Sequence, residues 1–64
     1  MPIAEIILRI RRDYHYNQRE LAGRLGINQA LISCWERGVR QPNRLHRALL
    51  QKHFGAYFDG NAGN

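Results

Sequence analysis

Two short helical patterns meet at a glycine in residues 17–38, NQRELAGRLGINQALISCWERG. Asn17 is a residue type that caps helices well, and apolar residues recur at helical spacing after it: Leu21, Ala22 and Leu25. Gly26 then supplies the conformational freedom that a tight turn requires. We therefore predict two helices, Gln18–Leu25 and Gln29–Arg37, joined by a turn with no room for a longer loop.

The second of these helices divides its residues between two faces. Asn28 is its expected N-cap, and Ile32 and Trp35 share the side that is predicted to be buried. Ile27 is expected to plug the corner of the turn, and Ala22 is small enough to let the two helices approach closely. The opposite side carries Gln29, Ala30, Ser33 and Cys34. That outward face is therefore short, polar and uncharged.

Two further helices are predicted on either side of this pair. Upstream, Pro2 suits an opening turn, and apolar spacing predicts a helix over Pro2–Tyr14. Its predicted inward residues are Ile3, Ile7, Ile10 and Tyr14. Downstream, Asn43 is expected to cap a helix that runs over about Arg44–His53. The predicted inward residues of this helix are Leu45, Ala48, Leu49 and Phe54.

The chain changes character after Gly55. The segment Ala56–Phe58 is expected to add one helical turn, whereas the glycines and asparagines of residues 59–64 predict a flexible tail. A chain of 64 residues suffices for one small domain, which we place at residues 1–58, and it buries only about 60% of its unfolded surface. The predicted fold class is all-α, a compact bundle of four to five helices.

The balance of charge favours a polyanionic partner. The formal net charge is +5, and nine of the ten basic residues are arginines, which suit bidentate contacts to phosphate. Charge alone does not choose between nucleic acid, membranes and acidic proteins, and many of these arginines can simply be solvated. The apolar start, Ile3–Leu8, is broken by Glu5 and followed by Arg9, far short of a membrane span or a signal-peptide core. We therefore expect no membrane partner and a cytoplasmic location.

Catalysis and metal binding receive little support from the sequence. The three histidines, His15, His46 and His53, lie far apart with no obvious acid or nucleophile set beside them. One cysteine cannot form an internal disulfide, and no Cys/His cluster has the spacing of a zinc site. We therefore expect no enzymatic activity, no metal, no cofactor and no small-molecule substrate.

Four features together resemble the DNA-binding domains of lambda-type repressors and Cro proteins. They are the NQxxLAxxLGI run, the Asn-capped helix that follows it, the WERG ending and the loop GVRQP at Gly38–Pro42. The resemblance covers roughly Ile3–Gly55 and implies a lambda-repressor-like bundle with a helix-turn-helix, and double-stranded DNA as the partner. The chain departs from the family at Gly23, where a polar residue is usual, and at His15, where glycine is frequent.

The same resemblance assigns one ion pair and a set of phosphate contacts. Glu36 needs a positive partner, because a carboxylate is unfavourable beside a helix C-terminus and near phosphates. The family pairs this glutamate with an arginine seven positions before the glutamine that opens the second helix, and Arg11 and Gln18 keep that interval. The expected contacts to the DNA backbone are Asn17, Gln18, Asn28, Arg37, Arg40 and Arg44. The three arginines flank the loop after the second paired helix and can instead enter a minor groove. Asn17 can instead serve as a cap alone.

Base reading is expected from the outward face of the second paired helix. Gln29, at its start, can make a bidentate contact to adenine or a looser one to guanine. Ala30 suits contact with a thymine methyl group, and Ser33 and Cys34 lie one turn further along. These small residues can equally serve only to avoid clashes with DNA, and Cys34 can also be a redox-sensitive thiol.

One such unit contacts too few base pairs for useful specificity, so we expect a homodimer on a pseudo-palindromic operator with half-sites about 34 Å apart. Three C-terminal aromatic residues, Phe54, Tyr57 and Phe58, either cover the core or meet the partner. A compact, phage-like repressor of the Cro type is the leading prediction. The alternative is an antitoxin-like or adaptor module that uses the same scaffold to hold another protein, and the two roles can coexist.

Overall fold

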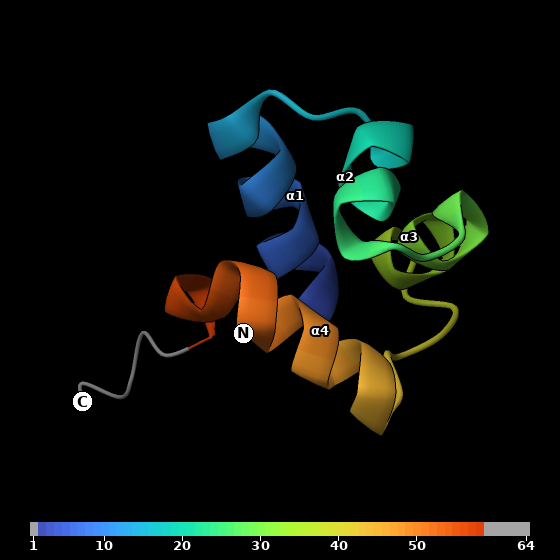
Figure 1. The fold of residues 1–64 in the computed structure, drawn as a ribbon. Helices are drawn as coiled ribbons and strands as arrows, with labels where there is room; N and C mark the ends of the chain where they lie inside the picture. Colours follow the sequence, from blue (N-terminus) through green and yellow to red (C-terminus); the bar gives the residue numbers. More distant parts are fainter. Residues whose placement is uncertain (1, 59–64) are drawn as a thin grey trace.

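The computed structural model describes residues 2–58, and this part of the chain is built from helices (Figure 1). Their bounds are α1 Ile3–Tyr14, α2 Gln18–Leu25, α3 Gln29–Glu36, α4 Arg44–Phe54 and a closing 3-10 turn, η1 Gly55–Tyr57. Residues 2–58 contain no strand. The all-α prediction is therefore confirmed, while the predicted flexible tail, residues 59–64, lies outside the described residues.

Side-chain caps define where three of the helices begin. The Asn17 side chain accepts a hydrogen bond from the Glu20 backbone N–H at 2.7 Å, and the Glu20 carboxylate accepts one from the Asn17 N–H at 2.8 Å. Asn28 and Asn43 cap α3 and α4 by accepting from backbone N–H groups at 2.7 and 2.8 Å. Each such cap contributes about 1 kcal/mol. The starts predicted for α2, α3 and α4 are therefore correct, and the predicted ends of α3 and α4 differ from the structure by one residue each.

Two left-handed residues end the first two helices. Gly26, after α2, has φ +73°, and its N–H donates back to the α2 carbonyls of Ala22 and Gly23. His15, after α1, has φ +59° and is the one non-glycine residue with positive φ among residues 2–58. A side chain with a Cβ is strained there, which explains why glycine suits this position. Both reversals let consecutive helices fold back onto each other.

The core lies where the inner faces of α1, α2, α3 and α4 converge. Its largest fully buried side chains are Trp35, Ile7, Ile10, Leu21, Ile32 and Leu50. Ala22, on the inner face of α2, is buried. Ile27, at the corner of the turn, is partly buried and packs against the core. The inward faces predicted for α2 and α3 are therefore correct.

The inward face predicted for α4 is wrong at two positions. Leu45 is 65% exposed and Ala48 is exposed, whereas Leu50 and Phe54 are buried and Leu49 is partly buried. Leu50 and Phe54 lie one turn apart and continue a stripe that starts at His46, whose ring lies 5.6 Å from the Trp35 ring. The side of α4 that carries this stripe faces inward because it meets Trp35, the buried tryptophan of α3.

Tyr14 is a second correction, because its side chain lies on the surface rather than in the core. Tyr14 is 49% exposed, and the buried residues of α1 are Ile3, Ile6, Ile7 and Ile10. Its ring stacks on Tyr16 at 5.4 Å and meets the edge of Phe54, also at 5.4 Å. The last turn of α1 thus extends beyond the core, and Tyr14 packs on Tyr16 and Phe54 at the edge of the core rather than inside it.

The C-terminal turn is fastened to the end of α1 by one short hydrogen bond. The Tyr57 hydroxyl donates to the Asp13 carboxylate at 2.6 Å. This hydrogen bond to an anion, with partial burial, raises the pKa of Tyr57 to about 12. Phe54 and the partly buried rings of Tyr57 and Phe58 pack on the core, so η1 is part of the folded unit.

Candidate nucleic-acid interface

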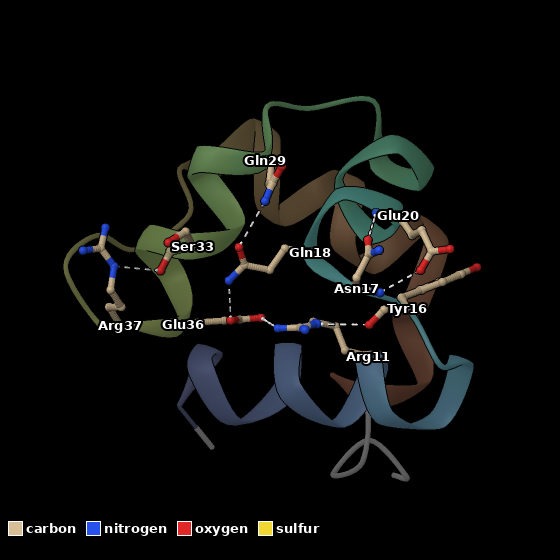
Figure 2. Close-up of polar contacts among 9 residues, drawn as sticks. All are labelled: Arg11, Tyr16, Asn17, Gln18, Glu20, Gln29, Ser33, Glu36 and Arg37. Carbon is tan, nitrogen blue, oxygen red and sulfur yellow. Dashed lines mark hydrogen bonds and ion pairs between the residues drawn. The ribbon is translucent and has the colours of Figure 1, made fainter.

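The first turns of α2 and α3 meet on one side of the molecule through a pair of glutamines. The side-chain N–H of Gln29 Nε2 donates to the side-chain oxygen Oε1 of Gln18 at 3.4 Å (Figure 2). Gln18 is the first residue of α2, and Gln29 is the first residue of α3. The turn at Gly26 and the caps at Asn17 and Asn28 therefore place two amide side chains, from helices joined by a tight turn, next to each other at the surface.

The Gln18 amide is itself anchored from behind by Glu36 at the end of α3. Gln18 Nε2 donates to one Glu36 carboxylate oxygen at 2.8 Å, and Arg11 donates to the other at 2.7 Å. Arg11 also donates through Nε to the Tyr16 carbonyl oxygen at 3.1 Å. Figure 2 shows this line of contacts running from the loop after α1, through Arg11 and Glu36, to Gln18 and Gln29. We call these side chains, Arg11, Glu36, Gln18 and Gln29, the polar chain.

Burial makes the inner end of the polar chain important for stability. The Arg11 and Glu36 side chains are only 26% and 11% exposed. Both Glu36 oxygens accept hydrogen bonds from the protein, so the carboxylate is satisfied at a helix C-terminus where it would otherwise be unfavourable. The pair joins α1 to α3, and thus sets the position of α3 against the helix behind it.

An open cleft of about 430 Å³ lies beside the outer end of the polar chain. It is lined by Arg11, Asn17, Gln18, Arg19 and Gln29. The charge of Arg11 is already paired with Glu36, so the cleft combines the Arg19 guanidinium with the N-terminus of α2, an arrangement that favours an anion such as a phosphate. Arg19 was not among the backbone contacts expected from the sequence. The sequence does place Arg19 next to Gln18 in the first turn of α2, and this position could have indicated a phosphate contact.

The four predicted base-reading residues share one surface of α3. Gln29 and Ala30 are exposed, and Ser33 and Cys34 are half-buried. Asn17 and Asn28 use their side-chain oxygens as caps, which leaves their amide N–H groups available to a phosphate. Capping by Asn17 uses its side-chain oxygen, and the amide nitrogen that the expected DNA contact requires is a different atom.

The three predicted arginine contacts occupy different places. Arg37 is the C-cap residue of α3, and its guanidinium donates to the Ser33 carbonyl oxygen at 3.4 Å and to the Cys34 sulfur at 3.8 Å. Arg40 lies in the loop before α4, and Arg44 is the first residue of α4. All three are exposed. The structure therefore brings Asn17, Gln18 and Gln29 together at one cleft and Arg37 onto α3, whereas Arg40 and Arg44 belong to the loop before α4 and to its first turn.

Residues 2–58 hold no group of three or more His, Cys, Asp or Glu side chains that could bind a metal ion. None of the helices in this range has the length and apolar character needed to cross a membrane.

Comparison with known proteins identifies the family. The family model described as helix-turn-helix matches residues 7–55, which include α2, α3 and α4 in full and most of α1. No curated protein and no solved structure matches the chain. The family comprises DNA-binding regulatory domains and is not a family of enzymes. Because the match spans most of the chain and the structure has the corresponding fold, this protein belongs to the Cro/C1-type helix-turn-helix family of DNA-binding transcription regulators.

Proposed function

We propose that the protein is a sequence-specific repressor of the Cro type, which binds a pseudo-palindromic operator as a dimer and blocks access to a promoter. The observation that carries this proposal is the contact between Gln18 and Gln29. At 3.4 Å this contact is long, but it lies beside the 2.8 Å hydrogen bond from Gln18 to Glu36. The proposed phosphate-binding amide of Gln18 is therefore oriented before DNA arrives, with the proposed base-reading side chain of Gln29 next to it. Pre-organised side chains lose less conformational entropy when they bind.

The direction of this contact favours adenine as the base that Gln29 reads. Gln29 gives one amide N–H to Gln18 and keeps its second N–H and its carbonyl oxygen. Adenine presents an acceptor, N7, and a donor, the N6 amino group, in the major groove. The free donor and acceptor of Gln29 match that pair. Ala30 beside it presents a methyl group that suits the methyl of thymine, and Ser33 and Cys34 extend the same face.

The cleft at the N-terminus of α2 supports a phosphate contact that positions α3 in the groove. Gln18 donates one amide N–H to Glu36, so its second N–H and its backbone N–H are available to a phosphate oxygen. Asn17 and Arg19 add donors around the same cleft, and Asn28 adds one at the start of α3. Arg40 and Arg44 offer contacts beyond the end of α3. Such contacts set the register of a protein on DNA without reading its sequence.

Two copies are needed for useful specificity, because one recognition helix reads only one half-site. The burial of Phe54 changes the surface that we propose to join them. Phe54 is 5% exposed and belongs to the core, and Tyr57 and Phe58 keep partly exposed rings. We therefore retain Tyr57 and Phe58, and not Phe54, as the proposed contacts between copies.

Selection of bound sequences from a random DNA pool tests the proposal, followed by titration of the selected site and a scrambled site at two salt concentrations. We expect an inverted repeat with half-site centres about one helical turn apart, bound at least about 1,000-fold more tightly than scrambled DNA. Weak binding with steep salt dependence and no consensus would show that only the charge of the chain acts.

Three glutamine variants sharpen this experiment. Gln29→Ala is expected to lose preference at one adenine position per half-site, and Gln18→Ala is expected to weaken binding to all sequences. Gln51→Ala, an exposed glutamine on α4, is the matched control and should bind like the parent.

The alternative function is an antitoxin-like or adaptor module that holds another protein. Large hydrophobic residues that stay exposed, among them Val39 and Leu45, favour it. A pure adaptor would retain its activity in Gln29→Ala and Gln18→Ala, whereas a repressor would lose sequence preference in the first variant and overall affinity in the second.

A further inference from the structure

The second half of the DNA-facing side of α3 carries no long side chain of its own. Gln29 stands at the N-terminal end, and the residues that follow on this side, Ala30, Ser33 and Cys34, are all short. A bidentate base contact requires two hydrogen-bonding groups on a side chain that reaches the floor of the groove. The later turns of α3 therefore need a long polar residue from the end of the helix if they are to read a base in this way.

Arg37 supplies such a side chain. It lies four positions after Ser33 and three after Cys34, so the three residues are neighbours on the helix surface. Its Nε lies 3.4 Å from the Ser33 carbonyl oxygen, and its Nη2 lies 3.8 Å from the Cys34 sulfur. The guanidinium therefore folds back over the turn that carries two predicted base-reading residues, as Figure 2 shows for Arg37 and Ser33.

Both contacts of this guanidinium are weak. A distance of 3.4 Å is long for an N–H···O bond, and sulfur is a poor acceptor. Within residues 2–58 no carboxylate pairs with Arg37, whereas Arg11 is held by Glu36. Two of the five N–H donors of the guanidinium are used. Of the remaining three, one from Nη1 and one from Nη2 point the same way and form the edge between these two nitrogens. That edge is available to a ligand at little cost.

Resting on the function proposed above, we propose that Arg37 is a second specificity-determining residue and that it reads a guanine in each half-site. An arginine offers only donors, and guanine presents two acceptors, O6 and N7, side by side in the major groove. The small side chains of Ser33 and Cys34 leave room for the arginine stem to lie between α3 and the DNA. Arg37 was expected from the sequence to contact the backbone, and its position over the reading face reassigns it.

The spacing of the two reading residues makes the proposal specific. Gln29 and Arg37 are eight residues apart, which corresponds to about 12 Å along an α-helix. The guanidinium lies back over Ser33, which is four residues or about 6 Å from Gln29. At about 3.4 Å per base pair, the guanine read by Arg37 should therefore lie about two to four base pairs from the adenine read by Gln29. The half-site is therefore expected to contain one adenine and one guanine with that separation.

The test compares sequence selection and affinity for the parent, Arg37→Ala, Arg37→Lys and Arg40→Ala. We expect Arg37→Ala to lose preference at the guanine position alone and to bind the parent operator about 5- to 150-fold more weakly. Replacing that guanine by adenine should weaken the parent by a similar factor and leave Arg37→Ala almost unaffected. Arg37→Lys keeps the charge but lacks the fork, so it should also lose the guanine preference.

Arg40→Ala provides the comparison with a backbone contact, because it should weaken binding to all sequences and reduce the dependence on salt. If Arg37→Ala behaves in the same way, Arg37 binds phosphate and the proposal is wrong. If Arg37→Ala leaves binding unchanged, the residue only caps α3, and the proposal is again wrong. Thermal unfolding of each variant identifies a folding defect, and Arg37→Lys then carries the test. If the sequences selected by the parent protein share no consensus, the proposed function itself is wrong.

Discussion

Gln18 and Glu36 lie 18 positions apart in the sequence, yet their side chains are joined by a hydrogen bond of 2.8 Å. This contact connects the ion pair behind α3 with the glutamine pair at the surface. The carboxylate that holds Arg11 on one oxygen orients the Gln18 amide with the other. One side chain, Glu36, therefore links the packing of α1 and α3 to the geometry of the proposed DNA contact.

Removing the arginine of this pair should destabilise the fold. We expect Arg11→Ala to lower the free energy of unfolding by about 2 kcal/mol, somewhat less than for a fully buried pair, because Glu36 would keep its charge in a largely buried site. Urea denaturation measures the change. Arg12→Ala is the matched control, because Arg12 is 75% exposed and its contact with Asp13 is long, at 3.8 Å, so its loss should cost less than about 0.5 kcal/mol. Equal stability of the two variants would show that the Arg11–Glu36 pair contributes little.

Replacing Gln18 by its charged isostere should damage both stability and DNA binding. Gln18→Glu puts a carboxylate against Glu36 in place of an N–H donor, and we expect a loss of about 2 kcal/mol from the missing hydrogen bond and the repulsion. The new charge also faces the cleft proposed to hold a phosphate, so operator affinity should fall more than in Gln18→Ala. Urea denaturation and titration with the selected operator measure the two effects. A variant as stable as the parent would mean that the Gln18–Glu36 contact is not maintained in solution.

Replacing Gly23, one of the two departures from the family, by alanine should stabilise the protein. Gly23 lies within α2, is exposed, and has no atom within 4 Å of where a Cβ would stand. Gly23→Ala is therefore expected to stabilise the protein by about 0.5–1 kcal/mol through helix propensity and lower chain entropy. Gly26→Ala also meets open space, but its φ of +73° strains any Cβ, and we expect a loss of about 1 kcal/mol. Thermal unfolding should show a higher midpoint temperature for Gly23→Ala and a lower one for Gly26→Ala than for the parent. A lower midpoint temperature for Gly23→Ala would refute the prediction.

The hydrogen bond between Tyr57 and Asp13 should be visible in the alkaline titration. Because the pKa of Tyr57 is raised to about 12 in the folded protein, the neutral phenol is stabilised by folding. Its contribution to stability is complete below the unfolded pKa of about 10 and disappears as the pH rises through about 12.

Absorbance titration of the three tyrosines in the parent and in Tyr57→Phe measures this shift. The difference between the two curves should be one phenol that ionises near pH 12, and Asp13→Asn should move that step to lower pH. A difference curve centred near pH 10 would show that the turn η1 is not held against α1.

Local hydrogen bonding explains why the start of each of three helices could be predicted. Asn17, Asn28 and Asn43 accept from backbone groups two or three residues ahead, and the turn at Gly26 depends on the φ of one residue. Such interactions need no distant partner. The family resemblance similarly led to Arg11 and Glu36 as an expected pair, because the interval between Arg11 and Gln18 is a feature of the sequence.

The orientation of α4 and the course of the polar chain were not available from local patterns. Helical spacing on α4 is compatible with an inward Leu45 as well as with an inward Leu50. In the folded protein the side of α4 that carries His46 meets Trp35, and Leu50, one turn further along that side, is buried. Gln18, Gln29 and Glu36 belong to different turns of two helices, and only the crossing of α2 and α3 brings their side chains within hydrogen-bonding distance. Capping and turn formation are interactions between near neighbours in the chain, whereas the choice of a buried face and the shape of a binding surface depend on contacts between residues far apart in sequence.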